Sequence, residues 1–164
     1  TSSKEAVVAM LEKFNFMTKK VDWKYKDFTA RELLTIASLV ESEGTPDIFT
    51  KVARVVYNRL EKGMPLQFDS TIHYINGRRG EIALSIEDTK KKDPYNTFIY
   101  RGLPPGPIGS PTLKAIQATL SPEPGNWLYF VTVLPGETKF TNSYDEFLKF
   151  KSEYKRNYAD GKFE

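Results

Sequence analysis

The chain has 164 residues, of which 40% are hydrophobic, so it can bury one good core in a single domain with at most a small appendage. It contains no cysteine and a single histidine, His73, which excludes a disulfide framework and leaves a Ser-His-Asp triad or a multi-histidine zinc centre almost without material. The 24 lysine and arginine residues are scattered among 21 acidic residues and leave a net charge of +3. This pattern disfavours nucleic-acid binding.

The first predicted element is a short helix. Val7, Met10, Leu11 and Phe14 recur at helical spacing, and a cap is expected around Ser2 or Ser3. We expect this helix to serve as a lead-in arm to the domain.

The second predicted helix carries an acidic residue on its apolar stripe. Thr29 and Glu32 predict a capping box at its start, and Gly44 predicts its end. One side is apolar and comprises Leu33, Leu34, Ile36, Ala37 and Val40. Glu41 projects between the directions of Ala37 and Leu34, whereas Glu43 lies at the edge of the stripe, where a solvated carboxylate is expected.

Glu41 therefore has two interpretations. A buried carboxylate has a raised pKa, and a general acid that works near neutral pH requires such a pKa. The alternative is a structural glutamate, either paired with an arginine or placed where the helix meets water. Helical spacing alone leaves both open.

The middle of the chain predicts a third helix, a strand and a long loop. The third helix runs over residues 47–62 and stops at Gly63. Residues 66–75 suggest an irregular strand, which the Asn76-Gly77 pair turns. Residues 93–111 are so rich in proline and glycine that we expect a shaped loop, ordered by tertiary contacts.

The last third predicts a helix followed by a hairpin. Ser110-Pro111 starts the helix, with proline at its first position. Residues 127–133 form an apolar strand, Pro135-Gly136 turns it, and residues 139–142 return.

Ser143 and Glu146 predict a capping box for a C-terminal helix. The order of these elements predicts an α+β fold, in which helices pack with a small antiparallel sheet and the proline- and glycine-rich loop lines a cleft.

Several strings together resemble the catalytic domain of the membrane-anchored endolytic murein transglycosylases, the MltG or YceG-like family. They are VESEG, YNRL, LQFDST, DPYNTFIYRGLPPGPIGSP and the hairpin WLYFVTV…TKFTNSYDEF. The resemblance runs from about Thr29 to Tyr154. It implies cleavage of the MurNAc-β-1,4-GlcNAc bond inside glycan strands without water, which leaves a 1,6-anhydroMurNAc end.

Such a reaction needs only one catalytic carboxylate, because the C6 hydroxyl of the sugar replaces water as the nucleophile. The resemblance implies that Glu41 protonates the leaving glycosidic oxygen and then accepts the proton of the C6 hydroxyl as it attacks C1. Hydrolytic glycosidases use two carboxylates instead. Asp69 is the natural second carboxylate if the protein is a hydrolytic muramidase.

The remaining site residues rest on chemistry and motif position. Gln67, Asp69 and Ser70 offer polar groups to sugar hydroxyls or N-acetyl groups, although turn chemistry explains them equally well. Tyr95, Asn96 and Thr97 are expected to line the cleft, with the tyrosine on a sugar face and Asn96 donating to an N-acetyl carbonyl or to the oxocarbenium-side oxygens, and the alternative is a purely architectural role.

Two further positions complete the expected site. Gly106, in the Gly-Leu-Pro-Pro-Gly string, is expected to allow close approach of the substrate because it has no side chain. Asn142 follows the second strand of the hairpin and is expected to face the cleft.

The resemblance also implies an N-terminal transmembrane helix and a LysM-like module, neither of which is visible here. Residues 1–28 would then be a connecting arm and residues 29–164 the catalytic domain, on the extracytoplasmic side of the bacterial cytoplasmic membrane. Peptidoglycan strands and the cell-wall synthesis machinery are the expected partners, and neither a cofactor nor nucleic acid is expected.

Two other classes remain open. One is a peptidoglycan-binding module without turnover. The other is a pyridoxal-phosphate lyase, which needs a Schiff-base lysine and a phosphate cup, and the sequence shows no glycine-rich phosphate loop of that type.

Overall fold

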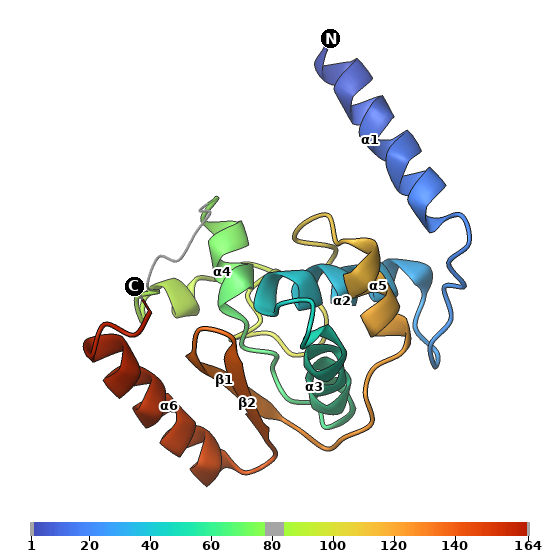
Figure 1. The fold of residues 1–164 in the computed structure, drawn as a ribbon. Coiled ribbons are helices and arrows are strands. Elements are labelled where there is room, and N and C mark those ends of the chain that lie inside the picture. The colour runs from blue at the N-terminus through green and yellow to red at the C-terminus, as the bar shows by residue number, and fades with distance from the viewer. Residues whose placement is uncertain (1, 78–83, 164) are drawn as a thin grey trace.

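The protein is a set of packed helices with one β-hairpin at its edge (Figure 1). The computed structural model describes residues 2–77 and 84–163. The elements in these ranges are α1 (Ser3–Thr18), α2 (Ala30–Glu43), α3 (Phe49–Glu61), α4 (Asp69–Ile75), the 3₁₀ helix η1 (Asp88–Lys90), α5 (Leu113–Leu120), β1 (Tyr129–Leu134), β2 (Glu137–Thr141) and α6 (Tyr144–Ala159). The α+β prediction is confirmed.

Helix α2 is the central element. It begins with the predicted reciprocal capping box of Thr29 and Glu32, and Gly44 caps its C-terminus. Helices α3 and α5 pack against it, and the fully buried side chains of this core include Ile36, Leu39, Val40, Val52, Val56 and Leu66. Helix α2 is buried because α3, α4 and α5 all contact it.

The predicted polar side of α2 is buried as well. Thr35 and Ser38, which lie opposite the apolar stripe, are only 2% and 1% exposed, respectively. The hydroxyl of Ser38 donates to the carbonyl of Thr35 and accepts the N–H of Ile108 at 3.1 Å. The loop therefore supplies a polar partner on this buried side.

The proline- and glycine-rich loop follows the length of α2. The guanidinium of Arg31 donates to the Pro105 carbonyl at 3.2 Å near one end, and the N–H of Thr112 donates to Glu41 at 3.0 Å near the other. Leu103, Pro104 and Pro105 line a cavity of about 580 Å³ beside the start of α2. The prediction that this loop lines a cleft is confirmed.

The segment predicted as an irregular strand is helical from Asp69 to Ile75. Its β-branched and aromatic residues are typical of strands, but tertiary contacts override that preference. Thr71 and Ile72 are fully buried, and the Phe68 N–H donates to the Thr97 hydroxyl rather than to a neighbouring strand. The Asn76-Gly77 turn is confirmed, with Gly77 at a φ of 62°.

The hairpin carries α6 on one side. Strands β1 and β2 pair antiparallel around Gly136, in a register that places Tyr129 opposite Thr141. Helix α6 packs on both strands, and the side chain of Asn157 donates to the carbonyl of Val133 at 2.7 Å. Figure 1 shows this unit at the edge of the helical body.

The N-terminal caps of α5 and α6 differ from the prediction. Helix α5 begins at Leu113 with Thr112 as its N-cap, not at Pro111, because Glu41 accepts the N–H and the hydroxyl of Thr112 and fixes the cap there. At α6 only half of the capping box forms. Ser143 accepts the N–H of Glu146, but the carboxylate of Glu146 accepts the hydroxyl of Thr141 instead.

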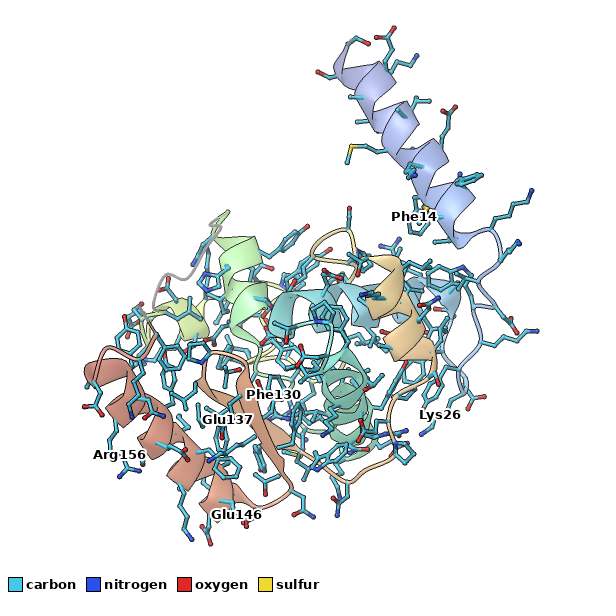
Figure 2. All side chains as sticks on the ribbon, in the orientation of Figure 1. Phe14, Lys26, Phe130, Glu137, Glu146 and Arg156 are labelled. Atoms are coloured by element: carbon cyan, nitrogen blue, oxygen red, sulfur yellow. The ribbon has the colours of Figure 1, made fainter. Side chains whose placement is uncertain are left out.

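Helix α1 projects away from the body (Figure 1), and none of its residues is buried. Figure 2 shows Phe14 at the end of α1 that is closer to the body. No helix in the described part of the chain combines the length and the apolar character that crossing a membrane requires.

Candidate active site at the α2–α4 corner

Glu43, in the last turn of α2, is the carboxylate with the most unusual surroundings. It is half-buried, and α4 lies against the end of α2. The N–H of Ser70 donates to its Oε1 at 3.2 Å, and the hydroxyl of Ser70 donates to the same oxygen in a short hydrogen bond. The two elements are thus joined through one carboxylate oxygen.

Burial raises the pKa of Glu43 to about 7. The hydrogen bonds from Ser70 oppose that shift, because they favour the charged form. Asp69 adds to the shift through charge repulsion, and the guanidinium of Arg59 lowers it slightly. A carboxyl with such a pKa is protonated in about half of the molecules at neutral pH, so it can both donate and accept a proton.

Arg59, on α3, lies near this corner and is held in place by hydrogen bonds. It is 7% exposed, and its guanidinium donates to three backbone carbonyls, those of Leu128, Pro65 and Leu66, at 2.7, 3.1 and 2.7 Å. These carbonyls are neutral, and no salt bridge to Glu43 is present among the described residues. Arg59 ties α3 to the segment that leads into α4.

Glu41, two residues earlier on α2, is bonded to the segment ahead of α5. It is only partly buried, and its Oε2 accepts the N–H of Thr112 at 3.0 Å and the Thr112 hydroxyl at 2.6 Å. The expectation that Glu43 is a solvated carboxylate at the edge of the stripe does not hold, because α4 lies against it, whereas the segment ahead of α5 supplies the donors to Glu41.

Gln67 and Asp69 precede Ser70 in the chain. The side chain of Asp69 is exposed to solvent at the start of α4, although partial burial raises its pKa and His73 and Lys151 counteract that. Gln67 is exposed at a φ of 55°, and its N–H donates to the Thr97 carbonyl at 3.0 Å. Both side chains are exposed to solvent.

Asn96 is not available. It is 0% exposed, and its side-chain amide donates to the carbonyls of Thr89 and Lys91 at 3.0 and 2.8 Å, while its oxygen accepts the Phe98 N–H. The expected contact of Asn96 with an N-acetyl group is therefore contradicted by its burial. Its amide closes the turn that follows η1.

Thr97 is buried as well, at 2% exposure. Its hydroxyl accepts the N–H of Phe68 at 3.0 Å and bonds the hydroxyl of Thr71 at 3.0 Å. It thereby holds the start of α4, from which Ser70 reaches Glu43. Thr97 therefore does not line a cleft as expected. It positions the start of α4 instead.

Tyr95 remains partly exposed, and Gly106 is packed against it. A Cβ on Gly106 would lie 3.3 Å from the Tyr95 hydroxyl and 3.1 Å from the guanidinium of Arg31. The close approach that Gly106 allows is thus to these protein groups. Asn142 is exposed at the end of β2, and no hydrogen bond between described residues joins it to Glu43 or to Tyr95.

Sequence reasoning missed Glu43 although a signal was present. Glu43 follows Ile36 and Val40 at intervals of seven and three residues, so it shares a helix face with two fully buried side chains. Tyr74, an exposed tyrosine on α4, was missed because the segment was assigned to a strand. No group of acidic residues and histidine in the described part of the chain has a metal-binding arrangement.

The chain matches the model of the YceG-like family over residues 1–153. A Bacillus subtilis protein named endolytic murein transglycosylase is 38% identical over 157 residues, which are 94% of this chain and 43% of that protein. A Streptococcus pneumoniae protein of the same name is 42% identical over 129 residues, 75% of this chain and 23% of that protein. The chain thus spans less than half the length of these relatives.

A solved structure agrees with this relationship. The crystal structure of a YceG-like protein from Listeria monocytogenes is 31% identical and superimposes with a TM-score of 0.69, over 88% of this chain and 45% of that one. Because the family model covers nearly the whole chain and the fold is shared, the chain belongs to the YceG-like family.

Proposed function

We propose that the protein is an endolytic peptidoglycan lytic transglycosylase, a lyase that cleaves the MurNAc-β-1,4-GlcNAc bond without water. The names of its relatives support action on murein. The observation that carries the proposal for this chain is a half-buried Glu43 whose pKa is raised to about 7 and whose orientation Ser70 fixes.

Glu43 serves as acid and then as base in the proposed reaction. Its protonated carboxyl donates to the glycosidic oxygen as the C1–O bond breaks. The resulting carboxylate accepts the proton of the C6 hydroxyl of the same MurNAc as that oxygen bonds to C1. One proton leaves Glu43 and one returns, the products are a GlcNAc hydroxyl and a 1,6-anhydroMurNAc end, and no second carboxylate is required.

Glu41 takes a structural role in this account. Its carboxylate anchors Thr112 and the end of the loop on α2, two residues away from the acid. The sequence-based assignment of catalysis to Glu41 is the competing proposal, and it differs from ours in which glutamine variant stops the reaction.

A hydrolytic muramidase is the second candidate, and Asp69 favours it. Asp69 lies close enough to Glu43 to raise the pKa of Glu43, so the corner does hold two carboxylates. A hydrolase would leave reducing MurNAc ends, and an Asp69→Asn variant would lose activity as fully as a Glu43→Gln variant.

Mass spectrometry of muropeptides separates these candidates. Purified sacculi are incubated with the wild-type chain and with its Glu43→Gln, Glu41→Gln and Asp69→Asn variants. We expect anhydro-ended products from every protein except Glu43→Gln. Reducing ends would contradict the lyase proposal, and binding of glycan without any product would favour a non-catalytic peptidoglycan-binding module.

The remaining assignments rest on the resemblance to the membrane-anchored endolytic murein transglycosylases. We place residues 1–28 as a connecting arm and residues 29–164 as the catalytic domain, facing the cell wall on the extracytoplasmic side of the membrane. Peptidoglycan strands are the proposed substrate, the cell-wall synthesis machinery the proposed partner, and an N-terminal transmembrane helix the proposed anchor of the full-length protein.

A further inference from the structure

Two tyrosines from different segments bring their rings together beside the α2–α4 corner. Tyr74 belongs to the last turn of α4 and Tyr95 to the loop after η1, and their ring centroids are 4.8 Å apart at an interplanar angle of 43°. Tyr74 is nevertheless 45% exposed. The pair is therefore held by a ring contact while Tyr74 stays exposed to solvent.

The position of Tyr74 follows from the geometry of α4. Tyr74 comes four residues after Ser70, so both side chains lie on one face of the helix, about 6 Å apart along its axis. Ser70 donates to Glu43. The aromatic face is thus one helical turn from the group that holds the acid.

Tyr95 is held rigidly in this arrangement. Its N–H donates to the Asp93 carboxylate at 2.9 Å, and its hydroxyl lies next to Gly106, where the Arg31 guanidinium also converges. The guanidinium in turn donates to the Pro105 carbonyl. A platform that is already ordered loses little conformational entropy when a ligand stacks on it.

We propose that Tyr74 and Tyr95 form a sugar-stacking subsite that holds the glycan strand next to Glu43. A pyranose ring has an apolar face of C–H groups and a polar rim, and an aromatic face with hydroxyls at its edge complements both. The subsite deepens the proposed function and rests on it, because it supplies the same strand to the acid.

Kinetics and binding on one short ligand test the subsite. The ligand is a GlcNAc–MurNAc tetrasaccharide without stem peptides, and the proteins are the wild-type chain, Tyr74→Ala, Tyr74→Phe and Tyr158→Ala. The last is a matched control, since Tyr158 is 64% exposed and also pairs with a second tyrosine, Tyr154, but belongs to α6. We measure KM and kcat by product formation and Kd by calorimetry.

We expect Tyr74→Ala to raise KM and Kd roughly tenfold with little change in kcat, because the lost aromatic face contacts the strand before and during the reaction. Tyr74→Phe keeps the ring and should stay close to wild type, as should Tyr158→Ala. Equal Kd values for Tyr74→Ala and Tyr158→Ala would overturn the subsite, and so would failure of the wild-type chain to bind.

The proposed function and the subsite fail in different ways. Wild-type protein that binds the tetrasaccharide without cleaving it would contradict the proposed function, and the Kd comparison would still decide the subsite. Cleavage by every variant with one KM would leave the function standing and overturn the subsite. Because Tyr74 is exposed, its alanine variant should fold, which near-ultraviolet circular dichroism checks.

Discussion

Glu41 and Glu43 stand two residues apart on the last turn of α2, and each accepts the N–H and the hydroxyl of one residue, but the elements that supply these donors differ. Glu41 faces the start of α5, where a backbone N–H and a hydroxyl of Thr112 satisfy one of its oxygens. Glu43 faces α4, where Ser70 bonds one oxygen and burial raises its pKa to about 7. The difference shows that the element packed against a helix face, more than the helical phase, decides which donors bond a carboxylate and what covers it.

The largest expected effect separates the two glutamates by activity. Glu43→Gln should lower the rate of glycan cleavage about 10²- to 10⁴-fold, because a general acid contributes that much and glutamine cannot donate to the leaving oxygen. Glu41→Gln should keep most of the activity. Release of anhydro-ended muropeptides over time measures both, and a larger loss in Glu41→Gln would reverse the comparison.

The pH dependence of stability sharpens the comparison further. A carboxyl whose pKa rises from 4.5 to about 7 on folding binds a proton in the native state that the unfolded state releases in that window. The free energy of unfolding should therefore fall as pH rises from 4.5 to 7, by up to about 3 kcal/mol from this group.

Urea unfolding of wild type and Glu43→Gln at a series of pH values measures this term. The variant lacks the titrating group, so its stability should increase relative to wild type as the pH approaches 7. Parallel curves for the two proteins would show that Glu43 has an ordinary pKa in the folded state.

The hydrogen bond by which Thr97 holds the start of α4 gives a third, smaller effect, on the free energy of unfolding. Thr97→Val leaves the buried Phe68 N–H without its acceptor, and the free energy of unfolding should fall by about 1–3 kcal/mol. Thr132→Val is a matched control, because the hydroxyl of Thr132 pairs with that of Thr138 at the exposed surface of the hairpin. Equal losses in both variants would contradict the positioning role of Thr97.

The smallest effect concerns the anchor itself. Glu41→Gln keeps an acceptor oxygen for Thr112 but loses its charge, so the stability should fall by no more than about 1 kcal/mol. Thermal unfolding measures it. A loss of several kcal/mol would indicate that Glu41 is the more deeply buried carboxylate after all.

The sequence predicts local structure well where side chains and backbone act on their own neighbours. The capping box of Thr29 and Glu32, the helix stop at Gly63 and the turn at Gly136 all depend on conformational preferences within a few residues, and all are present. The helix over residues 69–75 could not be predicted in this way, because its strand-like residues become helical through burial and through the distant Thr97.

The site follows the same rule. The Tyr-Asn-Thr string marked an important segment, but only the folded chain shows that Asn96 and Thr97 are internal and Tyr95 is partly exposed. Helical spacing placed Glu43 near Ile36, yet no local pattern indicates that α4 covers that side. Dielectric surroundings come from segments far apart in the sequence.

A direct titration of Glu43 tests the central claim without reference to activity. The side-chain carboxyl carbons of ¹³C-labelled glutamates are followed by nuclear magnetic resonance from pH 3 to 9, and the Glu43→Gln variant identifies the resonance of Glu43. A midpoint near 7 is the predicted result. A midpoint near 4.5, the ordinary value, would show that the α4 side of the helix does not turn Glu43 into an acid, and would contradict the account.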